Sequence, residues 1–264
     1  MKYLIHVLIL FYLLPLSVFA NTKGIISNDV TKSNKTTLTV AIAEGGYYPF
    51  YYKEKDTLKG LSVDIINYIK VNSHFDFNFI TLQWPRALDL VARGKVDLIL
   101  TLFKTPKRKQ IYYFIEPSYG SEINQLFSLT DTDIDFTGQL TQLAPYAIGT
   151  LREYSYGKAF DQAQYLKKRP ALTEEVLLKL LLNKQIDMLI GNPFKFSRLI
   201  NHEQLNTKVR AIMPYVAMTP VYMVLTKERK DSHTIKQTLE QLIQQLKSTP
   251  SYQELLDKYQ LNFK

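Results

Sequence analysis

Short apolar runs separated by amphipathic segments dominate the sequence from Leu38 onward. The run LTVAIA (38–43) is predicted to be a buried strand, and VDLILT (96–101) a further strand. Between them, FDFNFITL (75–82) alternates phenylalanines with other residues, which is typical of a half-buried strand. Strands that alternate with helical segments in this way predict an α/β protein with parallel strands.

The helices between these strands are predicted from their start and stop signals. Ser62 is expected to cap a helix whose apolar residues lie on one side. Pro85 suits the first turn of the next helix, and Gly94 suits its C-terminal end. Each helix would lie against the sheet through its apolar side.

A similar unit follows about ninety residues later. AIGT (147–150) is predicted to be a strand, Thr173 begins a leucine-rich helix, and IDMLI (186–190) is the next strand. In both units a helix is followed by a lysine-containing turn and then by Val or Ile, Asp and two apolar residues, at 86–100 and at 174–190. Although any two βαβ units share such features, the repeat favours two lobes with a cleft between them.

The C-terminal part adds one strand and two helices. VYMVLT (221–226) is predicted to be a strand, and Ser232 to cap a long amphipathic helix. Ser251 and Glu254 have the spacing of a capping box for a terminal helix. These helices need a partner surface, which the first lobe would supply.

The N-terminus has the features of a secretory signal. Residues 1–20 combine an early lysine, a short apolar run and small residues at the end, so we expect cleavage after Ala20. The alternative is an uncleaved anchor, although the apolar run is short against the roughly 20 residues of a membrane span. Residues 21–36 are polar and are predicted to be a flexible leader. The chain has no cysteine, so we expect neither a lipid anchor nor disulfides.

Charge and composition narrow the range of partners. The net charge of +9 comes from basic residues that are scattered along the chain, with short clusters at 104–109 and 167–169. An exported protein with this distribution is not expected to bind nucleic acid. The histidines are far apart and lack metal-ligand spacing, so no metal or other cofactor is expected.

Several motifs in order along the chain resemble the family 3 extracellular solute-binding proteins, which serve as amino-acid receptors of ABC importers. The matching segments are YYPF (47–50), GLSVDI (60–65), WPRAL (84–88), GKVDLIL (94–100), TPKR (105–108), FIEP (114–117), AIGTLREYSYGKAF (147–160) and NKQIDMLIG (183–191). Each motif alone is weak, but the ordered set spans nearly all of 38–262. The signal peptide and the absence of a lipid anchor predict a soluble periplasmic protein, and we expect it to be a monomer.

The resemblance also implies a two-lobed α/β fold of the type II periplasmic-binding-protein kind. Each lobe would be a mostly parallel sheet flanked by helices, and two hinge crossings near 122–128 and 217–223 would join the lobes. The first lobe would comprise 37–125 and 221–264, and the second 126–220.

The resemblance places ligand-binding residues in the first lobe. Arg108 matches the arginine that holds the ligand's carboxylate, a role suited to a guanidinium with two parallel donors. Tyr47 and Trp84 match the two aromatic walls of the ligand site. Glu44 matches a position that binds a basic ligand side chain in some members. The alternatives are a surface arginine in a basic run, a core tryptophan and an exposed loop acid.

Other candidate residues depart from the family pattern. Glu153 and Ser155 precede a predicted helix start, where backbone N–H groups favour an anion, although the carboxylate of Glu153 would oppose one. The family's ammonium-binding aspartate in the second lobe is replaced by Asn192, and its carboxylate-binding serine or threonine by Phe103. Arg86 is an added basic group beside the tryptophan. These departures leave the ligand class open.

The function expected from these features is periplasmic binding of a small, polar, carboxylate-bearing solute by hinge closure, followed by delivery to an ABC permease. A ligand-sensing component for a membrane receptor is an alternative. A periplasmic enzyme similar to cyclohexadienyl dehydratases is another, and it would require two of the carboxylates Glu44, Glu116 and Glu153 to meet in the cleft. No nucleophile-elbow motif is present, so we expect binding without catalysis.

Overall fold

The computed structural model describes residues 35–262 of the chain. The predicted signal peptide (1–20) and all but two residues of the predicted leader (21–36) lie outside the described residues. Among the helices that the structure does describe, none is both long and apolar enough to cross a bilayer.

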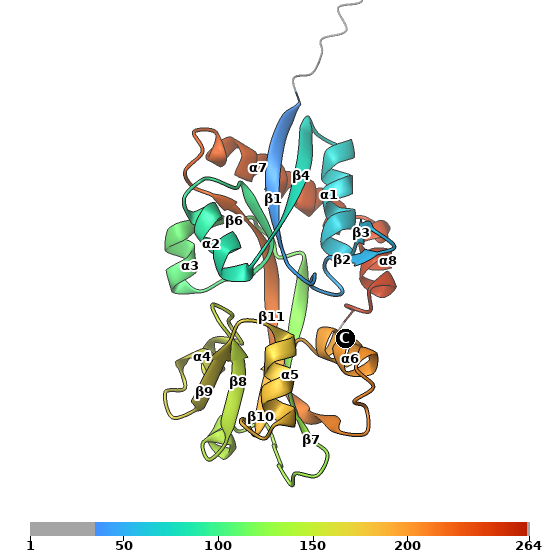
Figure 1. Cartoon of the computed structure of the whole chain (residues 1–264). Coiled ribbons are helices and arrows are strands. Elements are labelled where there is room, and N and C mark those ends of the chain that lie inside the picture. The colour runs from blue at the N-terminus through green and yellow to red at the C-terminus, as the bar shows by residue number, and fades with distance from the viewer. Residues whose placement is uncertain (1–34, 263–264) are drawn as a thin grey trace, which may run out of the picture. The chain divides into compact units, whose positions relative to one another are not determined.

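The first third of the described chain alternates strands with helices, as the sequence predicts (Figure 1). Its elements are β1 (Thr36–Ala43), β2 (Tyr52–Glu54), β3 (Thr57–Lys59), α1 (Leu61–Val71), β4 (Phe75–Leu82), α2 (Trp84–Ala92), β5 (Leu98–Phe103), α3 (Pro106–Ile111) and β6 (Tyr112–Phe114). We call the part of the molecule built on β1, β4 and β5 the first lobe.

The second part repeats the alternation, and the chain then ends with two helices. Its elements are β7 (Gly120–Leu129), the 3₁₀ helix η1 (Leu140–Leu143), β8 (Ala147–Leu151), α4 (Lys158–Gln162), β9 (Lys167–Ala171), α5 (Glu174–Leu182), β10 (Met188–Gly191), α6 (Pro193–His202), β11 (Val209–Thr226), α7 (Ser232–Lys247) and α8 (Pro250–Lys258). We call the part built on β8, β9 and β10 the second lobe.

The strand order shows that the two lobes repeat one arrangement. Nine of the described strands form one sheet in the order β4-β1-β5-β11-β7-β10-β8-β9, with β6 paired to β11, and β2 pairs with β3 in a separate hairpin. In the first lobe β1 is parallel to β4 and β5, and in the second β8 is parallel to β9 and β10. An antiparallel strand completes each set, β11 beside β5 and β7 beside β10. The α/β prediction and the predicted repeat are therefore confirmed.

The long strands β7 and β11 run side by side between the lobes (Figure 1). They pair in an antiparallel ladder whose register shifts between Ile212 and Ala217. A shift of this kind interrupts the hydrogen bonding and locally bends the strand. These two strands are the parts of the chain that connect one lobe to the other.

The aspartate of each repeated motif has the same structural role. The Asp97 carboxylate accepts a hydrogen bond from the backbone N–H of Thr39 at 2.7 Å, and its own N–H donates to the Thr39 carbonyl at 3.0 Å. Asp187 makes the corresponding bonds with Ala147, at 2.6 and 2.9 Å. Each aspartate therefore ties the start of the third strand to the first strand of its lobe. The repeated aspartate is a structural feature of the fold.

The apolar core is divided in the same way as the sheet. One set of buried side chains, from 38–119 and 221–261, packs around β1, β5, α1 and α7. Another set, from 126–212, packs around β8, β10 and α5. The helices α7 and α8 cover the first lobe, where α7 buries an apolar stripe against α1. The exact lobe boundaries stay a prediction.

The predictions of where helices begin and end are confirmed at some positions and wrong at others. Thr173 caps α5, because its hydroxyl accepts from the N–H of Val176 at 3.3 Å. Pro85 lies in the first turn of α2, and Gly94 follows that helix with a φ of +67°. These three predictions are confirmed.

The predictions for Ser62 and Ser232 are wrong. Ser62 lies inside α1, where its hydroxyl hydrogen-bonds with that of Tyr119 at 2.8 Å, and Gly60 precedes the helix. Ser232 is the first residue of α7, and its hydroxyl donates to the Thr226 carbonyl at 2.8 Å. Both side chains are buried and need hydrogen-bond partners. Each hydroxyl finds its partner in another element of the fold, and neither bonds to the N–H groups of its own helix.

Three element boundaries also differ from the predictions. β1 begins at Thr36, inside the predicted leader. α8 begins at Pro250, so Ser251 lies within its first turn and the predicted capping box does not form. β11 begins at Val209, well before the predicted strand at 221–226. Its first part was missed because it contains Pro214 and Pro220 and is largely exposed, which removes the usual strand pattern.

Candidate functional site

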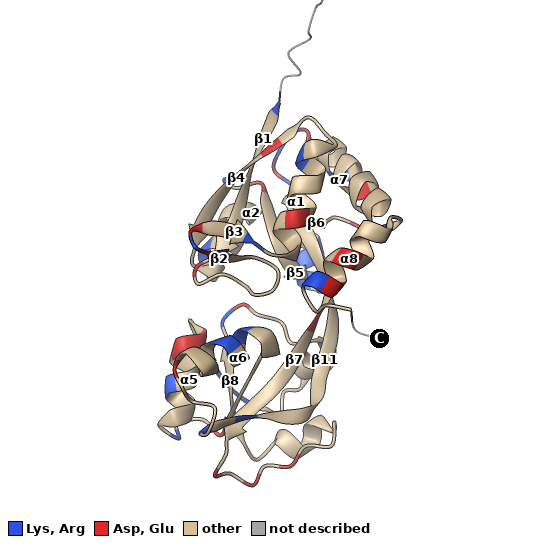
Figure 2. Cartoon of the chain, turned by 90° about the vertical axis from the view of Figure 1, so that its right-hand side faces the viewer, with Lys and Arg blue, Asp and Glu red and all other residues tan. Residues whose placement is uncertain are grey.

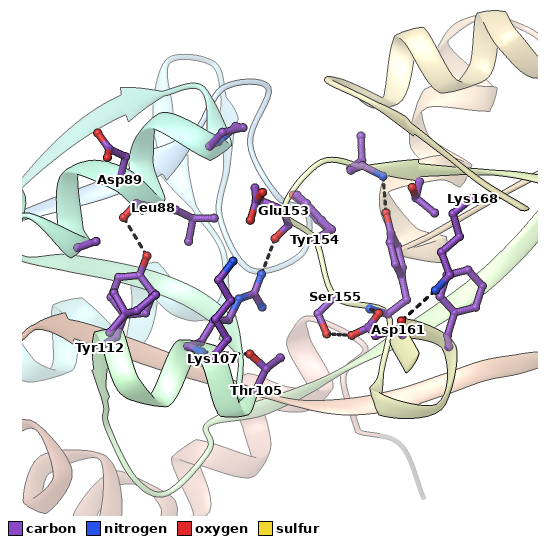
Figure 3. A pocket seen from close by; sticks show the side chains of 18 residues that line it. Leu88, Asp89, Thr105, Lys107, Tyr112, Glu153, Tyr154, Ser155, Asp161 and Lys168 are labelled. Atoms are coloured by element: carbon purple, nitrogen blue, oxygen red, sulfur yellow. Dashed lines mark hydrogen bonds between the residues drawn. The ribbon is translucent and has the colours of Figure 1, made fainter. Parts of the chain in front are cut away.

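Three cavities lie between residues of the two lobes and share Tyr154 as a lining residue. The largest, of about 580 Å³, lies between α2, α3 and the segment that follows β8 (Figure 3). We call it the outer cavity. The other two, of about 20 and 10 Å³, we call the inner cavities. Tyr47, Trp84, Phe103, Arg108 and Ser155, five of the predicted site residues, line the first inner cavity together.

Arg108 is held at the start of α3 by local structure. Thr105 caps this helix, accepting from the Arg108 N–H at 3.2 Å, and Pro106 occupies its first position. The guanidinium donates through Nη1 to the Phe103 carbonyl at 3.1 Å and through Nη2 to the Glu153 carbonyl. Burial lowers the pKa of Arg108, because desolvation disfavours the charged form.

The bonds of Arg108 leave its charge without a carboxylate. No ion pair of Arg108 is found among residues 35–262, because both acceptors of its guanidinium are neutral backbone carbonyls. Charge-assisted bonds to a carboxylate are about twice as strong as bonds to neutral acceptors. The guanidinium is therefore suited to bind an anion that enters the outer cavity.

Tyr47 enters the site from a tight turn. Gly45 and Gly46 have φ values of +74° and +73°, which glycine adopts without steric cost, and they direct Tyr47 into the core of the first lobe. Tyr47 is only 6% exposed. Trp84 begins α2 and packs against the same core from the other side of the site.

A third aromatic ring contacts both of these walls. The ring centroid of Tyr154 lies 6.1 Å from that of Tyr47 and 5.4 Å from that of Trp84. Tyr154 packs against core clusters of the first lobe and of the second lobe. The sequence analysis did not identify it as a site residue, because a tyrosine beside a predicted helix start carries no signal for an interaction with the other lobe.

The preceding residue gives this segment its direction. Glu153 has a φ of +60°, which is uncommon for any residue other than glycine, Asn or Asp. This conformation aims the Glu153 carbonyl at Arg108 and turns the chain so that Tyr154 enters the site (Figure 3). In this structure, the segment after β8 therefore fills the space between the aromatic walls.

A buried acidic residue that the sequence analysis missed lies beside these rings. Glu122, on β7, is 3% exposed, and the hydroxyl of Tyr47 donates to its Oε1. Burial raises the pKa of Glu122 from 4.5 to about 8, although the Tyr47 hydrogen bond and the charge of Lys195 favour the ionised form. Only the strand pairing of β7 brings this residue to the site, so sequence spacing gave no indication of it.

A buried ion pair belongs to the same region. Lys195, on α6, pairs with Glu174, on α5, at 2.7 Å, and both side chains are nearly buried. The Lys195 Nζ also lies 5.6 Å from the ring centroid of Tyr47. Both residues line the second inner cavity, together with Glu122 and Asn192.

Three polar atoms at the site lack partners. Among the described residues, Trp84 Nε1, Glu122 Oε2 and Asn124 Nδ2 are the buried side-chain nitrogen and oxygen atoms without a hydrogen bond. Each of these residues lines at least one inner cavity. Buried polar groups in proteins are nearly always hydrogen-bonded, so three unpaired atoms in one region are unusual.

The family of the chain follows from the comparison with known proteins. A model of the bacterial extracellular solute-binding proteins, family 3, matches residues 38–262. The chain belongs to this family. No curated protein matches the chain.

Solved structures of the same fold accompany the family match. A histidine kinase sensor domain similar to periplasmic binding proteins has a TM-score of 0.74 and 15% identity, covering 86% of this chain and 97% of its own. The substrate binding protein of an amino acid ABC transporter has a TM-score of 0.68 and 14% identity, covering 85% and 99%. Holo ArgBP from T. maritima has a TM-score of 0.68 and 14% identity, covering 84% and 95%. At these identities the likeness shows the two-lobed fold alone.

The departures from the family pattern have structural explanations. The Oδ1 of Asn192 accepts from the N–H groups of Phe194 and Lys195, at 2.9 and 3.2 Å, so this residue caps α6. Phe103 ends β5 with its ring packed in the first-lobe core, and its carbonyl is one of the two acceptors of the Arg108 guanidinium. Asn192 therefore serves to cap a helix, and Phe103 serves the core packing of the first lobe.

The predicted anion site before α4 is already filled. The Ser155 hydroxyl donates to one oxygen of Asp161, and the N–H of Tyr156 donates to the other at 2.9 Å. The carboxylate of Asp161 therefore satisfies the groups that were expected to hold a ligand anion. The α4 helix itself has only five residues, so its dipole is small.

Two predicted site residues lie outside the three cavities. Glu44 is exposed and accepts from the side chain of Gln83. Arg86 is also exposed and pairs with Asp89 at 3.2 Å. Neither residue lines the outer or inner cavities, because α2 turns the Arg86 side chain toward solvent.

The candidate acids of the enzyme hypothesis do not meet. Glu116 pairs with Lys104, Glu44 bonds to Gln83, and Glu153 lines the outer cavity. Within 35–262, no group of three or more potential metal ligands is present. Basic residues in the view of Figure 2 are scattered over both lobes, in agreement with their distribution in the sequence.

Proposed function

We propose that this protein binds a small, polar, carboxylate-bearing solute between its two lobes in the periplasm and delivers it to an ABC permease. The observation that carries the proposal is the half-buried guanidinium of Arg108, which faces a cavity between the lobes and whose hydrogen-bond acceptors within the described part of the chain are neutral carbonyls. The family match and the amino acid transporter component among the related folds support this function.

Binding would require residues of both lobes. Arg108, Tyr47 and Trp84 belong to the first lobe, whereas Asn192 belongs to the second. A solute that contacts both sides favours the arrangement in which the lobes are closed on it. β7 and β11 are the elements that would absorb this movement, since they connect the lobes.

The space between the aromatic walls is now too small for a solute. The inner cavity there measures about 20 Å³, which is room for about one water molecule. Tyr154 accounts for this, because its ring contacts both walls. A solute would therefore displace the Glu153–Tyr154 segment, exchanging the Glu153 carbonyl on Arg108 for its own carboxylate.

A thermal-shift screen of the mature protein with amino acids, dicarboxylates, polyamines and small peptides tests this function. A ligand at a hundred times its dissociation constant should add about 2.7 kcal/mol of stability. In Arg108→Ala we expect the affinity for that ligand to fall at least 100-fold, because a charge-assisted contact is lost. Arg93→Ala is the matched control, since Arg93 is an exposed arginine that pairs with Asp89 on α2.

The control variant and the melting temperatures without ligand show whether a loss of binding in Arg108→Ala is specific to the site. Arg93→Ala should bind as well as wild type, and both variants should keep unliganded melting temperatures close to that of wild type. Undiminished binding by Arg108→Ala would remove this residue from the site. If no compound in the screen shifts the melting temperature, solute binding itself is contradicted.

The likeness to a histidine kinase sensor domain favours a second candidate function, delivery of the bound solute's signal to a membrane receptor. Deletion of the gene distinguishes the two. A transport component is required for uptake of the labelled solute. A sensing component leaves uptake intact and abolishes the transcriptional response to the solute.

A further inference from the structure

The helix α6 has two faces that contact different lobes. Phe196 and Ile200, four residues apart on one face, are buried in the second-lobe core. Phe194 and Arg198 have the same spacing on another face, and Phe194 packs against the first-lobe core. This helix lies where the second lobe faces β2 and β3 (Figure 1 and Figure 2). A helix that belongs to one lobe therefore reaches across to the other.

The guanidinium of Arg198 lies against two tyrosine rings of the first lobe. Its Cζ is 5.5 Å from the ring centroid of Tyr48 and 5.5 Å from that of Tyr52. The centroids of these two rings are 4.8 Å apart, and that of Phe194 is 6.4 Å from Tyr48. A cation within about 6 Å of an aromatic face is attracted to that face. Arg198 therefore makes two cation–π contacts from the second lobe to the first.

The tyrosine rings are the main partners of Arg198. Within residues 35–262, its guanidinium forms no ion pair and no hydrogen bond. Glu54, at the end of β2, pairs with Lys59, and the pKa of Glu54 is lowered first by that hydrogen bond and to a smaller extent by the charge of Arg198. The Arg198 side chain is exposed, and cation–π contacts at exposed sites are weak. Such contacts can break and form again as the lobes move.

The first lobe holds both tyrosine rings in place. Tyr48 follows the glycine turn at 45–46, and Tyr52 begins β2, which pairs with β3. The turn packs directly on β2, because a Cβ added at Gly46 would lie 3.1 Å from the Tyr51 carbonyl oxygen and 3.2 Å from the Tyr52 Cα. The two rings therefore form a fixed receptor for the guanidinium.

A cavity of about 410 Å³ lies beside this contact. Tyr48 and Tyr52 line it from the first lobe, and Lys195, Arg198 and His202 line it from α6. A space of this size shows that the lobes are not closely packed here. Arg198 therefore bridges a gap between the lobes instead of lying within a continuous apolar interface.

We propose that Arg198 is a latch, whose contacts with Tyr48 and Tyr52 hold the two lobes closed in the absence of a solute. Opening of the lobes about β7 and β11 would move α6 away from the first lobe and break these contacts. Arg198 lines neither the outer cavity nor the inner cavities, so it acts on the closed conformation whatever the solute is. The inference concerns the unliganded protein and does not depend on the proposed function.

Distances between spin labels measure the closed and open populations of the unliganded mature protein. The chain has no cysteine, so Asn67→Cys on α1 and Lys179→Cys on α5, both at exposed positions, place one label on each lobe. We expect one main distance in this labelled protein. In Arg198→Ala a longer distance should rise about 3-fold or more relative to the main one, because two weak contacts are lost. Arg93→Ala, which removes an exposed arginine paired with Asp89, is the matched control and should leave the distribution unchanged.

Two variants of Tyr52 test the aromatic contact itself. Tyr52→Leu removes the ring face, whereas Tyr52→Phe keeps the ring and removes only a hydroxyl. We expect Tyr52→Leu to raise the longer distance, although less than Arg198→Ala does because the contact with Tyr48 remains. Tyr52→Phe should match the labelled protein without further changes. The double variant with Arg198→Ala and Tyr52→Leu should open no further than Arg198→Ala alone, since both changes remove one contact.

The distance distributions can overturn the proposal in three ways. An unchanged distribution in Arg198→Ala does so, because the lobes would then close without this contact. A labelled protein already dominated by a distance longer than the closed structure gives does so as well. Equal opening by Tyr52→Phe and Tyr52→Leu would show that the ring face does not hold the lobes. Solute binding is tested separately by the thermal-shift screen, so either proposal can fail while the other stands.

Discussion

At the scale of single residues, the site combines groups with clear partners and groups without them. Among the described residues, the guanidinium of Arg108 bonds only to carbonyl oxygens, and the buried carboxyl of Glu122 has one oxygen without a hydrogen bond. Tyr154 contacts the aromatic rings on both sides. Some polar groups of the site therefore lack hydrogen-bond partners. The ring of Tyr154 occupies the space between the aromatic walls.

The raised pKa of Glu122 predicts a pH-dependent loss of stability. Below pH 4.5 the carboxyl is protonated in both the folded and the unfolded state. As the pH rises toward 8, the unfolded chain loses this proton while the folded protein retains it, so stability falls through this interval. The loss is about 5 kcal/mol at most, because one pKa unit corresponds to about 1.36 kcal/mol.

Glu122→Gln should not show this loss of stability between pH 4.5 and 8. We expect the variant to match wild type at pH 4 and to be more stable at pH 8, by an amount of up to about 5 kcal/mol. Urea denaturation at both pH values measures the difference. An equal free-energy difference at the two pH values would contradict a raised pKa.

At the scale of secondary-structure elements, the repeated motifs have repeated structural roles. Asp97 and Asp187 each join the third strand of a lobe to the first strand. The pattern of apolar runs identified these strands correctly. It did not distinguish serines that cap helices from serines whose hydroxyls bond to other elements, since both types precede or begin an amphipathic segment.

The difference between real and apparent caps is measurable. Thr173 caps α5, so Thr173→Ala should lower the free energy of unfolding by about 1 kcal/mol. Ser251 is exposed within the first turn of α8 and makes no capping bond, so Ser251→Ala should change it by less than about 0.5 kcal/mol. Urea denaturation of both variants at one pH tests the pair, and equal losses would be inconsistent with the observed caps.

At the scale of the whole molecule, β7 and β11 connect two lobes with separate cores, and Tyr154 packs against the cores of both. The same tyrosine therefore stabilises the contact between the lobes and fills the proposed binding site. The solute and the ring of Tyr154 would therefore compete for the space between the aromatic walls.

Tyr154→Ala should show this competition. Removal of the ring is expected to lower the unliganded melting temperature, because a large side chain leaves three apolar clusters. It should also increase solute affinity several-fold, since the solute no longer displaces a packed ring. Thermal melting and calorimetry measure both effects, with Tyr154→Phe as the control that keeps the ring. Weaker binding by the alanine variant would show that Tyr154 contacts the solute instead of competing with it.

The sequence by itself determined the fold class and the repeated unit, and it pointed to residues that the structure brings together around one cavity. Apolar periodicity located β1, β4 and β5, and ordered motifs brought Tyr47, Trp84 and Arg108 to attention. These features could be predicted because they depend on residues close together in the chain or on a family pattern.

Only the tertiary structure decided what surrounds these residues. Glu122 enters the site through the position of β7 in the sheet, and Tyr154 through a left-handed turn at Glu153. The same structure places Arg86 in solvent, although it lies two residues from Trp84. The hydrogen-bond partners, burial and pKa of a site residue depend on side chains that are distant in sequence. Local sequence patterns therefore do not predict them.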